Sequence, residues 1–158
     1  MIFINVNFER IETVEELDNI NLPLYTISTA AKILGISIHT LRMYEREGLV
    51  LPFKKESGHR LYSQSDLDRV LCIRRAINEN KISIAGIKMI YSLIPCWQIV
   101  NCSDEEKSKC PSFTAHDKPC WTFSHKKNIC KKIECRDCTV YKDYQECDQI
   151  KGAIARLY

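Results

Sequence analysis

The sequence of 158 residues lacks the features that mark an exported or membrane-spanning protein. Its first residues, MIFINVNFER, contain no basic leader followed by a long apolar run and a small-residue cleavage site, so a secretory signal is not expected. No apolar stretch approaches the ~20 residues that a membrane helix needs. Lys88 and Pro95 interrupt the most apolar segment, IKMIYSLIPCWQIV. We therefore expect a cytoplasmic protein with no membrane partner.

Nine cysteines are the most unusual feature of the composition. Because thiols stay reduced in the cytoplasm, the count favours metal or redox chemistry over a disulfide framework. Eight of the nine lie between Cys96 and Cys147. The ninth, Cys72, falls within a helical pattern, where we expect a small buried hydrophobic residue.

Positive charge is concentrated in the middle of the chain. Residues 1–24 carry a net charge of −4, residues 25–95 carry +5 and residues 96–158 carry +2, which together give +3. A polyanion, if the protein binds one, is therefore expected at the middle segment.

The middle segment is predicted to form two short capped helices and a hairpin. Ser28 and Gly35 bound the first helix, TAAKIL, and Ser37 and Gly48 bound the second, IHTLRMYERE. Two helices of this length joined by GIS are typical of a helix-turn-helix. Two apolar runs then flank the turn-forming KKESG, which predicts a two-stranded wing.

Two more helices are predicted after the wing. Ser63 and Asp66 form a capping box at the start of the first. Ser83 begins the second, and Pro95 stops it.

This segment resembles the winged helix-turn-helix of the MerR family of bacterial transcription regulators, and NENKISIAGIKMI is most similar to the heat-shock-repressor branch. The resemblance covers residues 24–94. It implies binding to a near-palindromic operator in double-stranded DNA as a homodimer, with RNA polymerase as a further candidate partner and no enzymatic activity. The matching residues are Tyr25, Ala31, Gly35, Ser37, Thr40, Leu41, Arg42, Tyr44, Glu45, Gly48, Leu49, Pro52, Gly58, Arg60, Tyr62 and Asp66.

The resemblance implies DNA contacts from the second helix and the wing. His39 and Thr40 are the candidate base readers, and Lys54 and Lys55 are candidate phosphate contacts. In the alternative interpretation the two tyrosines are partly core residues and Arg60 only ties down the wing. The predicted DNA-contacting residues are Ser37, His39, Thr40, Arg42, Tyr44, Lys54, Lys55, Arg60 and Tyr62.

Two departures from the family pattern bear on mechanism. Met43 stands where the family usually has an aromatic residue, which removes one possible backbone contact. Family members commonly dimerise through a long helix after this domain, whereas here the helix is expected to stop at Pro95. The mode of dimerisation therefore stays open, and so does the choice between promoter untwisting and plain repression.

The remaining chain repeats a motif around its cysteines. Pro-Cys-Trp occurs twice, at Cys96–Trp97 and Cys120–Trp121, and Cys135-x2-Cys138 runs into the sequence TVY. This order resembles the two-CW module, a cysteine-rich domain attached to bacterial signalling proteins.

Three interpretations of this module remain open. Thiolates are soft ligands that suit zinc or an iron–sulfur cluster. A metal-free thiol–disulfide switch would use Cys135 and Cys138 as its natural pair. A reduced, purely structural domain is the third possibility. The candidate metal ligands are Cys96, Cys102, Cys110, Cys120, Cys130, Cys135, Cys138 and Cys147.

The predicted fold class is mainly α, a winged helix-turn-helix followed by a small irregular cysteine-rich domain. Residues 1–23 are an arm with a short strand pattern, residues 24–94 the DNA-binding domain and residues 95–158 the sensor. The predicted function is a DNA-binding transcriptional regulator gated by metal, cluster or thiol redox state. One alternative is a small thiol–disulfide oxidoreductase, although no thioredoxin-like βαβ pattern surrounds the C-x2-C motif. Another is a non-sensing architectural or anti-repressor protein with structural zinc.

Overall fold

The computed structural model describes residues 20–126, 128–144, 150, 152 and 155. Within this part the protein is mainly helical, as predicted, with short strands only in the N-terminal half. The predicted strand at residues 2–8 and the candidate ligand Cys147 lie outside the described residues.

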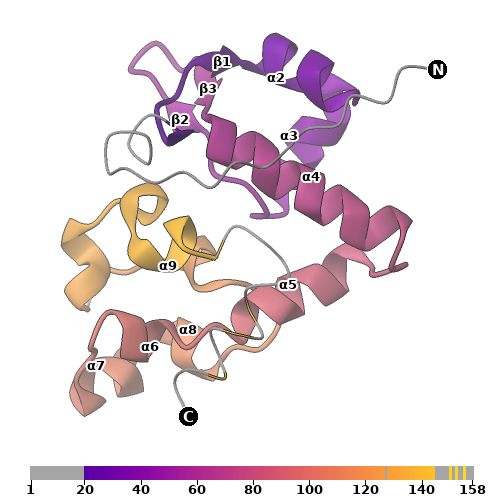
Figure 1. Ribbon diagram of the computed structural model, residues 1–158. Helices are drawn as coiled ribbons and strands as arrows, with labels where there is room; N and C mark the ends of the chain where they lie inside the picture. The colour runs from indigo at the N-terminus through magenta and orange to yellow at the C-terminus, as the bar shows by residue number, and fades with distance from the viewer. Residues whose placement is uncertain (1–19, 127, 145–149, 151, 153–154, 156–158) are drawn as a thin grey trace.

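The elements divide into a helix-turn-helix half and a cysteine-rich half (Figure 1). The first half contains β1 (Tyr25–Thr26), α2 (Ile27–Leu34), α3 (Ile38–Arg46), β2 (Phe53–Lys54), β3 (Arg60–Tyr62), α4 (Gln64–Asn78) and α5 (Ile84–Ser92). The second half contains α6 (Cys96–Ile99), α7 (Asp104–Lys109), α8 (Pro111–Thr114), η1 (Cys120–Thr122), η2 (Ile129–Lys132), η3 (Cys135–Asp137) and α9 (Thr139–Lys142), where η denotes a 3-10 helix.

Local capping sets the ends of the helix-turn-helix. Thr26 caps α2 by accepting a hydrogen bond from the Thr29 amide at 3.3 Å, which corrects the expectation that Ser28 is the cap. Gly35 ends α2 in the left-handed conformation with a φ of 61°, which costs glycine little. Ser37 caps α3 as predicted and accepts from the Thr40 amide at 3.0 Å.

The predicted wing is present as the antiparallel pair β2–β3. β1 joins the other edge of β3, so the strand order is β1-β3-β2, with Tyr25 opposite Tyr62 and Phe53 opposite Leu61. Gly58 turns the hairpin with a φ of 80° and donates its amide hydrogen bond to the Lys55 carbonyl at 2.8 Å. The sheet therefore fixes the wing beside α2, with which it also packs.

α4 and α5 begin where the sequence predicts. Ser63 and Asp66 form both hydrogen bonds of the capping box, Ser83 caps α5, and α5 ends three residues before Pro95. Cys72 on α4 is half-buried and disulfide-bonded, which corrects the expectation of a small buried thiol.

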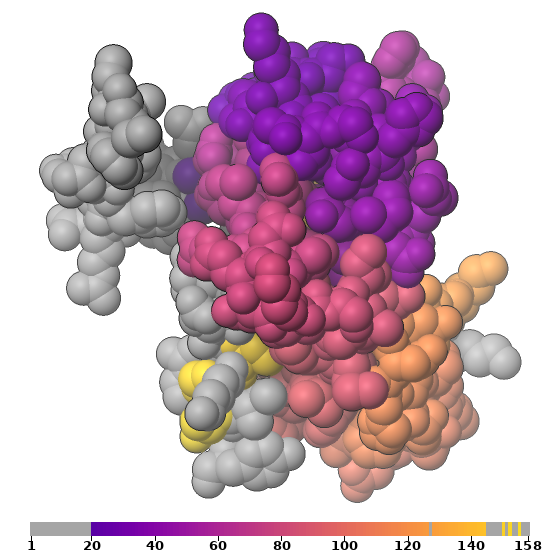
Figure 2. Space-filling model, turned by 90° about the vertical axis from the view of Figure 1, so that its right-hand side faces the viewer, coloured from indigo at the N-terminus to yellow at the C-terminus, as the bar shows by residue number. Residues whose placement is uncertain are grey.

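The two halves share one hydrophobic core. Leu41 and Val70 of the first half belong to the same buried cluster as Trp121, Val140 and Tyr141 of the second. Figure 1 shows the cysteine-rich elements beneath the helix-turn-helix, and Figure 2 shows the two halves forming a continuous surface along α4 and α5. The second half is thus packed against the DNA-binding fold.

Candidate DNA interface and cysteine cavity

Helix α3 separates a buried face from an exposed one. Leu41 and Tyr44 face the core, with exposed fractions of 0% and 5%. His39, Arg42 and Arg46 are exposed. Since residues three or four apart share a helix face, these three side chains form one outward stripe on α3. The stripe presents two guanidinium groups and an imidazole, which can bind a polyanion.

The hydroxyl groups of Ser37 and Thr40 are used for capping. They lie 2.9 Å apart, and Ser37 also accepts the Thr40 amide hydrogen bond. Both residues keep some exposure at the start of α3. Their position is compatible with the predicted role, but part of their hydrogen-bonding capacity holds the helix end.

Glu45 ties the wing to α3. The Arg60 Nε donates to Glu45 Oε2 at 2.7 Å, and the Tyr62 hydroxyl donates to the other carboxylate oxygen. Tyr62 is fully buried, and burial raises the pKa of its phenol. Tyr62 and the almost fully buried Tyr44 are therefore core residues, which corrects their prediction as DNA contacts. Arg60 remains one-third exposed while it anchors the wing.

The wing presents two lysines beside α3. Lys54 and Lys55 are exposed on β2 and in the turn that follows it. Lys54 lines the same groove as Arg46 of α3. Phosphate contacts of this kind position a protein on DNA, and side chains on the helix between them can read bases.

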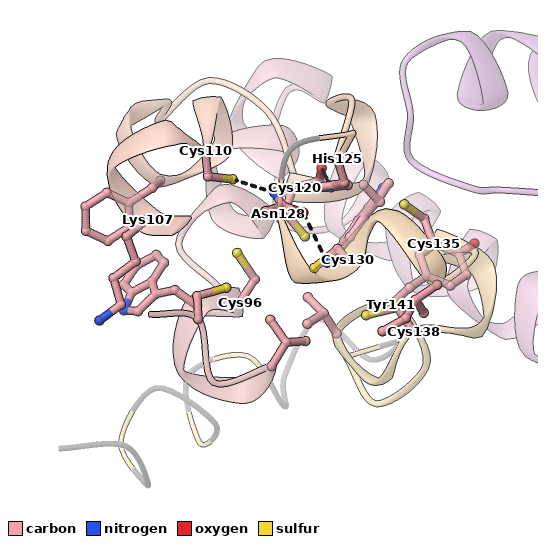
Figure 3. Close-up of a pocket in the computed structure, with 17 residues that line it drawn as sticks. Cys96, Lys107, Cys110, Cys120, His125, Asn128, Cys130, Cys135, Cys138 and Tyr141 are labelled. Atoms are coloured by element: carbon pink, nitrogen blue, oxygen red, sulfur yellow. Dashed lines mark hydrogen bonds between the residues drawn. The ribbon is translucent and has the colours of Figure 1, made fainter. Parts of the chain in front are cut away.

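All seven cysteines that the structure describes as free line one cavity (Figure 3). The cavity has a volume of about 30 Å³, and its other walls are mostly apolar, including Trp97, Phe113 and Trp121. Four of these cysteines belong to α6, η1, η2 and η3, and the other three lie in the connections between elements. They are Cys96, Cys102, Cys110, Cys120, Cys130, Cys135 and Cys138.

A buried amide organises one side of this cavity. Asn128 has an exposed fraction of 7%. Its Nδ2 donates to the Cys110 sulfur at 3.4 Å, and its Oδ1 accepts from the Cys130 amide at 3.1 Å. His125 lies 3.2 Å from the same Nδ2 and 2.9 Å from the Cys120 carbonyl oxygen. The Asn128–His125 pair thus links three of the cysteines, which spacing along the chain did not reveal.

The thiols strongly perturb one another. Hydrogen bonding with Cys120 lowers the pKa of Cys96 to about 7, while the same bond and burial raise the pKa of Cys120. Burial, together with the charges of neighbouring cysteines, raises the pKa of Cys130 to about 12 and also raises those of Cys102 and Cys135. The raised pKa values of Cys102, Cys120, Cys130 and Cys135 favour the protonated form of these four thiols.

The predicted ligands that the structure describes do not converge on one point. Among the described residues, no three His, Cys, Asp or Glu side chains are placed to hold a metal ion. A tetrahedral zinc site with Zn–S bonds of ~2.3 Å needs its sulfurs about 3.8 Å apart. A single structural zinc therefore does not fit the present arrangement.

Three side chains of the cysteine-rich half contact the first half, two of them at the segment that follows α3 and one at α4. The Trp121 Nε1 donates to the Gly48 carbonyl at 2.7 Å, and the Leu51 amide donates to the Tyr141 hydroxyl at 2.8 Å. Arg136 forms a bidentate bridge with Asp66, at 2.6 Å and 3.0 Å. Its motif, CRDC, gave no sign of this role, because the partners lie 70 residues apart.

A buried arginine completes the junction. Arg69 on α4 is 1% exposed, and its guanidinium donates to the Tyr141 carbonyl. Its Cζ lies 4.0 Å from the ring centroid of Tyr141, 5.5 Å from that of Trp121 and 5.6 Å from that of Tyr91. Cation–π attraction at these distances is strongest where water is excluded. The three rings therefore stabilise the buried Arg69 guanidinium at the contact between the two halves.

Comparisons with known proteins assign the first half. Residues 25–93 match the family model described as "MerR HTH family regulatory protein", so this segment carries a MerR-type helix-turn-helix domain. No solved structure is significantly similar to the chain. The match ends at residue 93, so the resemblance of the second half to the two-CW module stays a prediction.

Curated relatives include proteins named as transcriptional regulators. The chain is 38% identical over 71 residues to the "Putative heat shock protein HspR" of Streptomyces coelicolor, which covers 45% of this chain and 47% of that protein. It is 38% identical over 72 residues to the "HTH-type transcriptional regulator MlrA" of Escherichia coli, covering 45% and 29%. It is 35% identical over 85 residues to the "Probable heavy metal-dependent transcriptional regulator" of Haemophilus influenzae, covering 53% and 59%. The chain thus spans only about a third to three fifths of these relatives.

No helix in the described part of the chain is long and apolar enough to cross a bilayer.

Proposed function

We propose that the protein is a cytoplasmic, sequence-specific DNA-binding transcriptional regulator whose cysteine cavity controls its action on a promoter. The observation that carries the DNA-binding part is the outward stripe of α3, with His39 and Arg42, beside the wing lysines Lys54 and Lys55. A helix in the major groove with a flanking wing on phosphates uses this set of residue types. The MerR-type match of residues 25–93 supports the same conclusion.

The regulator acts as a homodimer on a near-palindromic operator. One helix-turn-helix reads few bases, and useful specificity needs two half-sites about 34–36 Å apart or a multiple of that distance. α5 ends at Ser92, so the dimer is completed by the cysteine-rich half or the N-terminal arm. RNA polymerase is a further partner if the regulator activates rather than represses.

Arg42→Ala is expected to weaken operator binding by about 1–3 kcal/mol, or about 5- to 150-fold, because it removes an exposed guanidinium from α3 that can contact DNA. Since Arg42 is exposed, the substitution should not disturb the core. Lys109→Ala is the matched control, since it removes one exposed positive charge from α7. Titration of a labelled operator measures both variants, and sedimentation of the complex is expected to give two chains per operator. Equal weakening by both substitutions, or one chain per operator, would contradict the assignment.

Gating is proposed to travel through the elements that carry the cysteines. In η1, Cys120 lines the cavity while the adjacent Trp121 bonds to Gly48. In η3, Cys135 lines the cavity while the adjacent Arg136 donates to the Leu51 carbonyl. A change in the position of either sulfur therefore reaches the segment between α3 and the wing within one residue.

The state of the cavity is expected to change operator affinity by about 5- to 150-fold, the size typical of allosteric coupling. The same operator is titrated with protein that is metal-loaded, metal-depleted and reduced, or oxidised. Far-UV circular dichroism checks that the total helix content is unchanged in each state. Identical affinity and identical promoter output in all three states would reduce the cysteine-rich half to a structural support.

A further inference from the structure

A groove lies between the wing and the cysteine-rich half. Its volume is about 790 Å³, within the range of roughly 300–1,000 Å³ that is typical of ligand-binding clefts. The end of α3 and the wing form one wall, and residues 123–126, η2 and η3 form the other. In Figure 1 the wing lies above these orange segments. Unlike the cysteine cavity of about 30 Å³, this groove has room for a ligand larger than a single ion.

Unpaired positive charge lines both walls of the groove. Arg46 of α3 and Lys54 of β2 contribute it from the first half. Lys126 and Lys131 contribute it from the cysteine-rich half. All four residues are exposed, and none of them forms an ion pair with another described residue. Their charge is therefore available to a bound anion.

The remaining acidic and arginine side chains at the groove are largely paired. The ion pairs are Glu45 with Arg60, Asp66 with Arg136 and Asp137 with Lys142. Among the described lining residues, Glu134 is the one carboxylate that has no ionic partner. A cleft with an excess of one sign of charge between its walls attracts counter-ions more strongly than an open surface does. The groove therefore favours an anionic ligand.

The groove continues the face that is proposed to bind DNA. Arg46 belongs to the outward stripe of α3 with His39 and Arg42, and it also lines the groove. Lys54 belongs to the wing and lines the groove as well. A duplex that lies along α3 and the wing therefore reaches the groove. Because double-stranded DNA carries one negative charge per ~1.7 Å of its axis, it can use cations on both walls.

We propose that this groove holds a segment of the DNA backbone, and that Lys126 and Lys131 of the cysteine-rich half bind its phosphates. The cysteine-rich half is then a second DNA-binding element as well as a sensor. Contacts from lysine to phosphate carry no sequence information, so this surface adds affinity to any sequence that α3 reads. The inference rests on the proposed function, because it needs a protein that binds DNA.

The test measures how salt weakens the binding of the full chain to two labelled duplexes. One duplex is selected for tight binding from a random-sequence library, and the other is unselected. Each lost phosphate contact should lower the slope of log K against log salt concentration by about 0.9. Lys126→Ala and Lys131→Ala should each show this change on both duplexes, and the double variant should show about twice as much.

Lys132→Ala is the matched control. Lys132 is exposed and follows Lys131 in η2, but it is not among the residues that line the groove. Its substitution removes the same charge and should leave the slope unchanged. An equal change of slope in Lys131→Ala and Lys132→Ala would show a general effect of charge and would overturn the inference.

Glu134→Gln gives a result that loss of folding cannot produce. It removes the carboxylate that opposes a bound phosphate, so binding to both duplexes should become tighter. Unchanged affinity in Glu134→Gln, or unchanged slopes in Lys126→Ala and Lys131→Ala, would also overturn the inference. If Arg42→Ala still weakens binding to the selected duplex in that case, the proposed function stands without the groove. Wild-type protein that binds neither duplex would overturn both.

Discussion

Arg136→Ala should lower the free energy of unfolding by about 3–5 kcal/mol, because it leaves the buried Asp66 carboxylate without its ionic partner. Asp66 is 2% exposed and receives both nitrogens of the guanidinium fork, at 2.6 Å and 3.0 Å. The same fork also donates to the Leu51 carbonyl and, at 3.1 Å, to the Ser63 hydroxyl. Few other side chains in the described part of the chain link the two halves through so many bonds.

Urea unfolding measures this loss. Both tryptophans, Trp97 and Trp121, belong to the cysteine-rich half, so their fluorescence reports on that half while circular dichroism reports the total helix content, to which α4 contributes most. Arg136→Lys keeps the charge but loses the fork, so an intermediate loss is expected. Lys142→Ala is the matched control, because its bridge to Asp137 is exposed and 3.7 Å long, which predicts less than about 1 kcal/mol. Equal losses for Arg136→Ala and Lys142→Ala would show that the buried bridge is not stabilising.

Gly48→Ala is expected to destabilise the protein by about 2–5 kcal/mol through two separate effects. Gly48 has a φ of 71°, where a side chain costs about 1–2 kcal/mol. An added Cβ would also overlap the Thr122 Cγ2 of the cysteine-rich half, and such overpacking adds about 1–3 kcal/mol. The second effect exists only if the two halves meet as described.

A double-mutant cycle separates these effects. Thr122→Ser removes the Cγ2 and keeps the hydroxyl that donates to the Pro119 carbonyl at 2.7 Å, so Gly48→Ala/Thr122→Ser should regain the overpacking part. Gly35→Ala is the control, because Gly35 has a φ of 61° with nothing within 4 Å of an added Cβ. It should lose only the conformational part. An additive cycle, with no regain in the double variant, would contradict the contact between Gly48 and Thr122.

Local signals in the sequence predicted much of the first half. The caps at Ser37, Ser63 and Ser83 each depend on residues within one helical turn, so spacing alone could place them. The start of α2 was misplaced because Thr26 and Ser28 are both good caps. Thr26 is the cap because Tyr25 and Thr26 pair with β3. This pairing joins residues far apart in the sequence, so local spacing could not reveal it.

The site could be predicted in part. Exposure of His39 and Arg42 follows from helical periodicity, whereas the burial of Tyr62 follows from its bond to Glu45, which lies in a different element. The cysteines were recognised as a group, but not the amide of Asn128 that orders them. An asparagine has no distinctive spacing, and only the folded chain brings it to the sulfur of Cys110.

The aromatic surroundings of Arg69 have a consequence for how the protein is made. Translation releases α4 and its arginine well before the ribosome reaches Trp121 and Tyr141, whose rings and carbonyl enclose that charge. Until residue 141 has emerged, the nascent helix-turn-helix must keep Arg69 in water, because burying it without partners is costly. A chain cut short before η1 and α9 would therefore be left with an incomplete core, which quality-control proteases recognise.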